Sequence, residues 1–145
     1  MLVQIKTTTD LNSQVYADAV AIRMEVFVKE QGVDRQLELD FEKGPIYYVG
    51  YLADKPVATA RVIVQEDNGW HLQRVAILKA FRGQKLGSQI LKAIESDARE
   101  NKVSYLTLGA QDQAQLFYTK LGYQVVGKGF LDANIVHHRM DKKII

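Results

Sequence analysis

Apolar and polar residues alternate one by one at the start of the chain and then change to helical spacing. The alternation over residues 1–6 predicts a strand. Asp10 is placed to cap a following helix, whose apolar stripe consists of Val15, Ala19, Ile22, Val26 and Phe27. Gln31-Gly32-Val33 ends this helix and begins an acidic stretch, for which a loop or a short second helix is expected.

Residues 46–78 are rich in β-branched and aromatic side chains, which favour strands. Strands are predicted over residues 46–52, 57–64 and 70–78. Ala53-Asp54-Lys55-Pro56 is typical of a hairpin turn, and Asn68-Gly69 is a tight-turn signal before the third strand.

After Gly83 the spacing of the apolar residues changes from that of a strand to that of a helix. A helix ending near Asn101 is predicted from one apolar stripe, formed by Leu86, Ile90, Leu91, Ile94 and Ala98. A strand over 103–108, a short helix over 113–120 and a closing hairpin of 123–130 with 135–140 follow. One strand–helix–strand unit inside an otherwise antiparallel sheet predicts a mixed α/β or α+β fold, and the absence of repeats and linkers indicates one domain over 1–145.

Composition excludes several classes of protein. The 145 residues are 47% hydrophobic and 25% charged, which is ordinary for a globular domain and unlike disordered, collagenous or coiled-coil chains. No apolar run approaches the roughly 20 residues of a membrane span, and the amino terminus lacks a secretory signal pattern, so we expect a cytoplasmic protein without membrane partners. Cysteine is absent, which removes disulfides, thiolate metal sites and cysteine nucleophiles.

Charge is balanced overall but unevenly distributed. The net charge of +2 produces no overall positive electrostatic field that would attract a nucleic acid backbone. Residues 68–94 contain no acidic side chain, whereas residues 25–42 are mainly acidic. Two solvated surfaces of opposite sign would explain this, as would a pocket for an anionic ligand beside one for a cationic ligand.

The turn at residues 82–88 is the most informative segment. A predicted strand runs into a glycine-containing turn that opens directly into a helix, whose first N–H groups and dipole favour an anion such as pyrophosphate. Gly83 and Gly87 allow close approach to the main chain, and Arg82 and Lys85 add positive charge. Neither a Walker A nor a GxGxxG motif is present, and a helix that merely starts after glycine is the alternative.

Two segments resemble the GNAT superfamily of acetyl-CoA-dependent N-acetyltransferases. Residues 82–87 (Arg-Gly-Gln-Lys-Leu-Gly) resemble its motif A, Gln/Arg-x-x-Gly-x-Gly/Ala, and residues 114–123 resemble its A-x-x-F-Y-x-K-L-G-F segment. Residues 26–31 and 134–137 are similar to the ElaA-like branch, and the element order matches over nearly the whole chain. Lys85 stands where the motif has Gly, and Gln111 where many members have Asn.

The resemblance implies a GNAT fold, with a mixed, mostly antiparallel sheet of six or seven strands and about four helices. It also implies transfer of an acetyl group from acetyl-CoA to a primary amine by direct attack in a ternary complex, without a metal. The backbone of Val75, Ala76 and Ile77 would pair with the pantetheine arm. A strand N–H near Ala76 or Ile77 would donate a hydrogen bond to the oxyanion that forms when the amine attacks the thioester carbonyl. The remaining cofactor-binding residues would be Arg82, Gly83, Gln84, Lys85, Leu86, Gly87, Ser88, Gln111 and Phe117.

Three side chains are candidate acids or bases. Tyr118 occupies the position of the family's frequent tyrosine acid for the departing thiolate, and a packed aromatic residue beside Phe117 is the alternative. His71 stands where some relatives carry a glutamate base, and the ElaA-like segment also has a histidine at His137. Ordinary strand histidines are the alternative. Strand alternation places His71, Gln73 and Val75 on one face, and His137 and His138 on opposite faces, which argues against a shared metal.

The partner of the reaction is less well defined by the sequence. Glu30 and the acidic loop through Asp40 are candidates for holding a cationic small-molecule or peptide amine, or they form a solvated loop. A non-catalytic acyl-CoA-binding or regulatory module of the same fold is one alternative function. Nucleic-acid binding through residues 68–94 is another, but no recognition motif supports it. A homodimer formed through the carboxy-terminal strands is compatible with the sequence.

Overall fold

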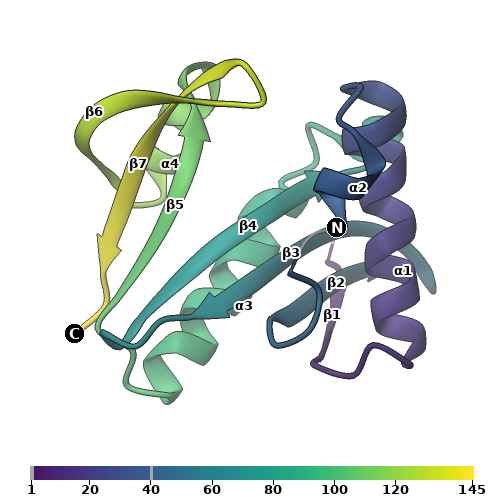
Figure 1. Ribbon diagram of the computed structural model, residues 1–145. Coiled ribbons are helices and arrows are strands. Elements are labelled where there is room, and N and C mark those ends of the chain that lie inside the picture. Colours follow the sequence, from purple (N-terminus) through teal and green to yellow (C-terminus); the bar gives the residue numbers. More distant parts are fainter. Residues whose placement is uncertain (1, 40) are drawn as a thin grey trace.

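In the computed structural model, which describes residues 2–39 and 41–145, seven strands form one sheet in the order β1-β2-β3-β4-β5-β7-β6 (Figure 1). The strands are β1 (Gln4–Thr8), β2 (Ile46–Leu52), β3 (Lys55–Val64), β4 (Gly69–Ile77), β5 (Tyr105–Gln111), β6 (Gln124–Asp132) and β7 (Ile135–Lys143). Each neighbouring pair is antiparallel except β4 and β5. The predicted mixed fold class is confirmed.

Four α-helices connect the strands within these described ranges. They are α1 (Gln14–Arg23), α2 (Arg35–Glu38), α3 (Leu86–Glu100) and α4 (Gln115–Lys120). A π-helical segment, η1 (Met24–Glu30), continues α1, and short 3₁₀ turns, η2 (Lys79–Phe81) and η3 (Asp112–Ala114), precede α3 and α4. None of the helices described is long and apolar enough to cross a membrane.

The cap predicted for the first helix was wrong. Ser13, and not Asp10, is the N-cap of α1, because its hydroxyl accepts a hydrogen bond from the backbone N–H of Tyr16 at 3.2 Å. The Asp10 carboxylate instead accepts from the N–H of Asn12 at 2.8 Å, which closes a turn ahead of the helix.

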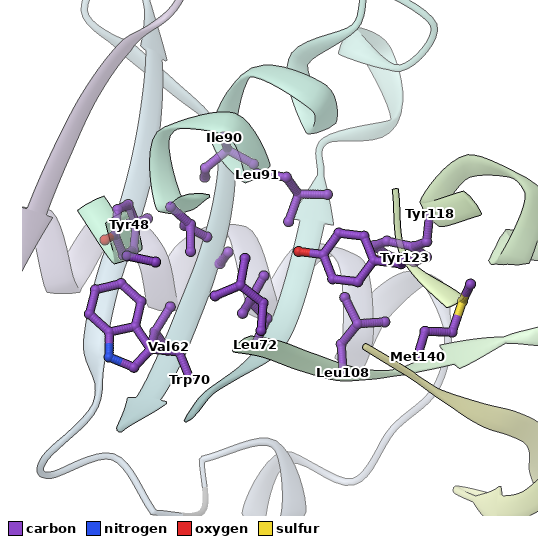
Figure 2. Close-up of a cluster of buried hydrophobic side chains, with 14 of the residues drawn as sticks. Tyr48, Val62, Trp70, Leu72, Ile90, Leu91, Leu108, Tyr118, Tyr123 and Met140 are labelled. Atoms are coloured by element: carbon purple, nitrogen blue, oxygen red, sulfur yellow. The ribbon is translucent and has the colours of Figure 1, made fainter. Parts of the chain in front are cut away.

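Helices cover both faces of the sheet (Figure 1). On one face, the α1–η1 residues Ala19, Ile22 and Val26 pack against β2 and β4. On the other, α3 presents the predicted stripe of Leu86, Ile90, Leu91, Ile94 and Ala98 to a larger cluster around Trp70, Leu72 and Leu106 (Figure 2). Each fully buried aliphatic side chain contributes about 1.5–3 kcal/mol, so the two helices hold β2, β3 and β4 rigidly in place.

β4 and β5 separate soon after they meet. Their parallel pairing is confined to Gly69 with Tyr105, Trp70 with Leu106 and His71 with Thr107. Beyond these pairs the strands diverge, as Figure 1 shows, and the facing edges of the two strands lie apart. The divergence opens the interior of the molecule between two otherwise well-packed sheet halves.

The alternation predicted along β4 was wrong beyond Gln73, because a β-bulge at Arg74 interrupts it. Gln73 pairs with Arg61 and Ala76 with Thr59, so β4 contains one residue more than β3 in this interval. Arg74 has a positive φ of 56°, and the extra residue reverses the faces that follow it. Val75 therefore packs into the α3 core and not on the face of His71 and Gln73, where the alternation had placed it.

Candidate functional site

A cleft of about 1300 Å³ lies where β4 and β5 diverge. Three side chains predicted to be catalytic, His71, Tyr118 and His137, line this one cleft although they come from β4, α4 and β7. Val75 and Gln111 also line it. The structure thus brings the predicted acid and both predicted bases together in one cavity.

Tyr118 lies in an apolar environment at the wall of the cleft. Its ring is 9% exposed and makes edge-to-face contacts with Phe117 at 5.0 Å and with Tyr123 at 5.7 Å between centroids. Burial raises the pKa of Tyr118 to about 12, and its hydroxyl has no hydrogen-bond partner among the described residues. The hydroxyl is therefore protonated at neutral pH and available as a donor.

His137 is held in the cleft wall by one ring nitrogen and by stacking. Its Nδ1 lies 2.7 Å from the carbonyl oxygen of Ile135, and its ring stacks on Phe130 at 5.8 Å between centroids. Because a carbonyl can only accept, Nδ1 donates this hydrogen bond, which leaves Nε2 as the ring nitrogen able to exchange a proton with a ligand. The side chain is 9% exposed, so Nε2 lies in a largely desolvated wall of the cleft.

His71 is the other histidine that was predicted as a base, and it also lines the cleft. Burial lowers the pKa of His71 from its usual 6.5, and the positive charges of Arg139 and Arg61 lower it further. The ring is therefore uncharged at pH 7 and able to accept a proton. His138 does not join this group, because its Nδ1 lies 2.7 Å from the carboxylate of Asp112. No group of three or more metal-binding side chains is present in residues 2–39 and 41–145.

The turn before α3 has the backbone geometry of an anion site. Gly83 and Lys85 both have positive φ, 80° and 64°, and Lys85 is the N-cap of α3 without a side-chain capping bond. The first helical hydrogen bond runs from the N–H of Gln89 to the carbonyl of Lys85 at 3.2 Å. The N–H groups of residues 86–88 precede it and point out of the helix end, together with the positive end of its dipole.

Two residues of this turn act through their backbone. The side chain of Leu86 is 1% exposed and belongs to the core, so only its N–H is available to a ligand. A Cβ at Gly87 would lie 3.3 Å from the ring of Phe117, which is tighter than most real Cβ contacts. Gly87 therefore lets the half-exposed Phe117 lie directly against the start of α3.

Arg82 and Glu30 form a bidentate ion pair that sequence reasoning missed. The two terminal nitrogens of Arg82 each lie 2.7 Å from a Glu30 oxygen, and Arg82 Nε donates to the carbonyl of Ile77 at 3.0 Å. The hydrogen bonds from Arg82 hold the pKa of Glu30 below its usual range. This pairing competes with the predicted role of Glu30 in holding a cationic acceptor. Asp40, the other predicted acceptor residue, lies outside the described residues.

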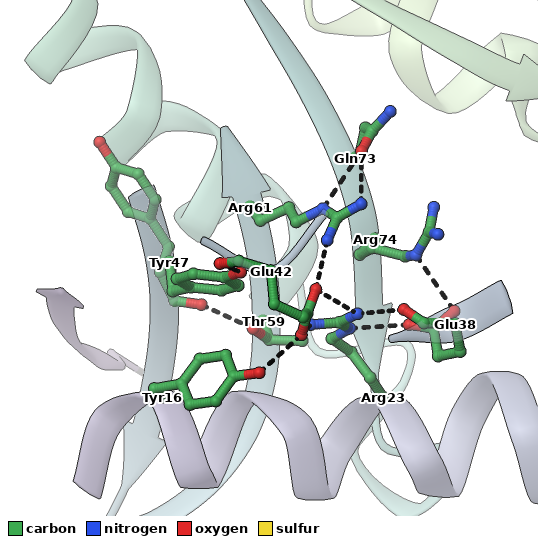
Figure 3. A network of polar contacts seen from close by, with 10 residues as sticks. Tyr16, Arg23, Glu38, Glu42, Tyr47, Thr59, Arg61, Gln73 and Arg74 are labelled. Carbon is green, nitrogen blue, oxygen red and sulfur yellow. Dashed lines mark hydrogen bonds and ion pairs between the residues drawn. The ribbon is translucent and has the colours of Figure 1, made fainter. Parts of the chain in front are cut away.

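A buried network of charged side chains borders the cleft (Figure 3). Arg23 Nε lies 2.7 Å from Glu38 Oε1, and Arg23 Nη1 lies 2.7 Å from Glu42 Oε1. Arg61 Nη1 lies 2.5 Å from Glu42 Oε2, and Arg74 Nε lies 3.1 Å from Glu38 Oε2. Arg23, Glu38 and Arg61 are at most 2% exposed, so the charges neutralise one another away from water.

One sequence signal pointed to this network. Arg61 lies in the middle of β3, whose neighbours are apolar and buried, and a charge at such a position requires a partner. The partners Glu38 and Glu42 belong to the acidic stretch, where composition suggested a solvated loop. Only the fold brings them to Arg23 and Arg61.

Replacing Lys85 should distinguish its backbone conformation from its charge. A residue other than glycine in the left-handed conformation costs about 1–2 kcal/mol of stability. Glycine removes this cost, but its additional flexibility in the unfolded chain offsets part of the stability gained. We therefore expect Lys85→Gly to be more stable than Lys85→Ala by about 1 kcal/mol in urea unfolding. Both variants lose the same charge, so equal stabilities would contradict the strain assigned to Lys85.

Known proteins share both the sequence and the fold. A family model described as acetyltransferase (GNAT) domain matches residues 8–144. The uncharacterized N-acetyltransferase YjcF of Bacillus subtilis (strain 168) is 39% identical over 140 residues, which cover 95% of this chain and 99% of YjcF. ElaA of Escherichia coli (strain K12) is 31% identical over 138 residues, which cover 92% of this chain and 90% of ElaA.

Crystal structures agree with these matches. That of Escherichia coli ElaA superposes with a TM-score of 0.85 and 23% identity over 97% of this chain and 99% of ElaA. An aminoglycoside 6′-N-acetyltransferase complexed with coenzyme A superposes with a TM-score of 0.77 and 19% identity over 98% of this chain and 97% of that protein. The predicted resemblance, including its ElaA-like branch, is confirmed. The chain belongs to the GNAT acetyltransferase family and is an acyltransferase.

Proposed function

We propose that this protein transfers an acetyl group from acetyl-CoA to a primary amine by direct attack in a ternary complex. The observation that carries the proposal is the cleft between β4 and β5, lined by Tyr118, His71 and His137 and accompanied by an uncapped helix start at α3. Acetyl-CoA bound in this cleft would have its pyrophosphate at the start of α3 and its thioester near Tyr118. Absence of cysteine is consistent with transfer without an acyl-enzyme.

The turn residues fit a pyrophosphate. The N–H groups of Leu86, Gly87 and Ser88 and the dipole of α3 supply donors, and the ammonium of Lys85 adds charge beside them. Gly83 and Gln84 complete the turn, and Arg82 fixes it to η1 through Glu30. The coenzyme A complex of the aminoglycoside 6′-N-acetyltransferase supports the same ligand for this fold.

The diverging edge of β4 fits the pantetheine arm. Beyond His71, β4 lacks its parallel pairing with β5, so a ligand amide can pair with the backbone around Val75 and Ala76. The N–H groups of this segment are the candidates for oxyanion stabilisation, because only a hydrogen-bond donor can stabilise the developing negative charge. Gln111 and Phe117 would flank the arm from β5 and α4.

Tyr118 and the histidines divide the proton transfers between them. Tyr118, protonated because burial raises its pKa to about 12, donates to the departing sulfur. Nε2 of His137 accepts the proton of the attacking amine, directly or through water, and neutral His71 is the second candidate for this base. Acetyl-CoA supplies the activated acyl group, and the protein supplies position and proton transfer.

Calorimetric titration with acetyl-CoA, CoA and ATP tests the proposal. We expect micromolar binding of acetyl-CoA and CoA but not of ATP, which carries a phosphate chain without the pantetheine arm. Release of CoA on adding amines would then show transfer. Binding without transfer to any amine would instead identify a non-catalytic acyl-CoA-binding module, and no binding by the wild type or by Lys85→Gly would overturn the proposal.

A further inference from the structure

We propose that Phe130 of β6 is a positioning residue for the reaction, whose ring, lying against Gly109 of β5, holds the ring of His137 in the orientation that leaves Nε2 for proton transfer. This inference rests on the proposed acetyl transfer and gives a role in the same cleft to two residues outside the predicted site. It follows from three features of the structure: a stack of two rings, the space left by one glycine, and an irregular strand pairing.

The ring of Phe130 stacks on the ring of His137. The two centroids are 5.8 Å apart and the ring planes differ by 23°. The two residues are also direct partners in the pairing of β6 with β7, and both line the cleft. Phe130 is 43% exposed and His137 only 9%, so the phenyl ring lies between the imidazole and solvent. An offset stack at this distance is a favourable arrangement of two aromatic rings.

The stack supplies a restraint that the hydrogen bond of His137 cannot supply alone. Nδ1 lies 2.7 Å from the carbonyl oxygen of Ile135, two residues earlier in the same strand. The bond between Cβ and Cγ of histidine has a broad, roughly two-fold torsional preference. A half-turn about it would break the hydrogen bond and move Nε2 to another place. A flat ring packed on the imidazole opposes this rotation, because the imidazole would have to turn its edge into the phenyl ring.

Gly109 makes room for the ring of Phe130. A Cβ at this position would lie 3.0 Å from Phe130 Cζ, which is tighter than most real Cβ contacts. Gly109 lies beyond Thr107, the last residue of β5 that pairs with β4, and it lines the cleft. A side chain at position 109 would therefore displace the phenyl ring and disturb its stack on His137.

The irregular pairing of β6 brings Phe130 to His137. Val126 pairs with Arg139 and Phe130 with His137, so β6 has three residues between these pairs where β7 has one. Figure 1 shows β6 curving beside β7. A regular continuation from Val126 would place Lys128 opposite His137. The positive charge of a lysine there would oppose protonation of the imidazole, whereas the phenyl ring of Phe130 carries no charge.

NMR of the histidine side chains tests this placement directly, because the chain contains only three histidines. The ¹⁵N signals of His137 are those that disappear in His137→Gln. At a pH where the ring is neutral, we expect the wild type to carry the proton on Nδ1 alone. Phe130→Leu removes the ring but keeps an apolar side chain, and the proton should then be shared between both nitrogens. Leu131→Val is the matched control, because Leu131 is the next residue of β6 and is 68% exposed, and it should leave these signals unchanged.

Rates of acetyl transfer show whether the placement serves the reaction. CoA release from acetyl-CoA is measured with benzylamine, cadaverine and glycinamide as acceptors, and the fastest is used. Phe130→Leu and Gly109→Val should each lower kcat about 10- to 100-fold, because a misplacement of about 1 Å has effects of this size. Both variants act through His137, so neither should lower kcat more than about twofold further when His137 is already replaced by Gln.

Four results would overturn the inference and leave acetyl transfer intact. They are unchanged His137 signals in Phe130→Leu, an equal loss of kcat with and without His137, a wild-type kcat in His137→Gln, and kcat values that follow thermal stability. A higher KM for the amine at unchanged kcat would also overturn it, since Phe130 would then contact the acceptor. If none of the three amines is acetylated, the proposed transfer fails for them. The ¹⁵N spectra of Phe130→Leu and Gly109→Val then judge the inference alone: shared protonation supports it, and a proton that stays on Nδ1 overturns it.

Discussion

Replacing Tyr118 with phenylalanine should lower kcat for acetyl transfer about 100- to 1,000-fold, within the range that a positioned general acid supplies. The hydroxyl is the polar atom of Tyr118 at the cleft, and it makes no hydrogen bond within residues 2–39 and 41–145. Its removal therefore leaves no protein group unpaired, and stability and acetyl-CoA affinity should stay close to those of the wild type. Steady-state rates with a saturating amine, together with calorimetry, measure both quantities.

Tyr123 provides a matched control for this experiment. It is 3% exposed, its pKa is also raised by burial, and it contacts the ring of Tyr118, but it is not among the residues that line the cleft. Tyr123→Phe should keep kcat within about twofold of the wild type. An equal decrease in both variants, or a Tyr118→Phe rate within threefold of the wild type, would assign Tyr118 to packing and not to proton transfer.

The pH profile gives a second measurement of the same residue. A general acid works while it is protonated, so its contribution is lost as pH rises through its pKa. With the pKa of Tyr118 raised to about 12, this loss falls above the usual assay range. We therefore expect no decrease in kcat between pH 7 and about pH 10 that depends on Tyr118. A decrease present in the wild type and absent in Tyr118→Phe would contradict the raised pKa.

The elements of this fold could be predicted because each depends on local periodicity. The apolar stripe of α3 and the β-branched and aromatic residues of β2 are properties of neighbouring residues, and both predicted elements were confirmed. The anion-binding turn was also visible, since glycine and basic residues stand together between a strand and a helix. Its motif placed residues 82–88 at the start of α3, where the structure has them.

The acceptor side of the cleft depends on contacts between distant residues. Glu38 and Glu42 meet Arg23 and Arg61 across 15 and 19 residues, and Glu30 meets Arg82 across 52. No local pattern specifies such pairs. The bulge at Arg74 could not be predicted either, because the additional residue in β4 is detectable only when β4 is paired with β3. Every residue of β4 after the bulge points to the opposite face from the one that strict alternation predicts.

The buried network predicts a large loss of stability when Glu42 is neutralised. Glu42 is 12% exposed and accepts hydrogen bonds from Arg23, Arg61 and the hydroxyl of Tyr16. Glu42→Gln would leave two guanidinium groups buried with one carboxylate fewer. Breaking a buried pair in this way destabilises by about 3–5 kcal/mol, which urea unfolding at pH 7 measures. Glu25→Gln is the matched control, because Glu25 is 56% exposed and its pair with Lys29 should contribute less than about 1 kcal/mol.

The difference between wild type and Glu42→Gln should also depend on pH. Burial alone would raise the pKa of Glu42, but the hydrogen bonds from Arg23 and Tyr16 and the charges of Arg23 and Arg61 outweigh it, so the pKa is lowered on folding. Stabilisation from such a group is complete above its unfolded pKa of about 4.3 and is lost as pH falls through the lower folded value. The two proteins should therefore begin to converge in stability as pH falls below the unfolded pKa, and converge fully only below the lowered folded pKa. A difference that is constant from pH 7 to pH 3, or one smaller than about 1 kcal/mol at pH 7, would mean that the arginines are balanced by groups other than Glu42.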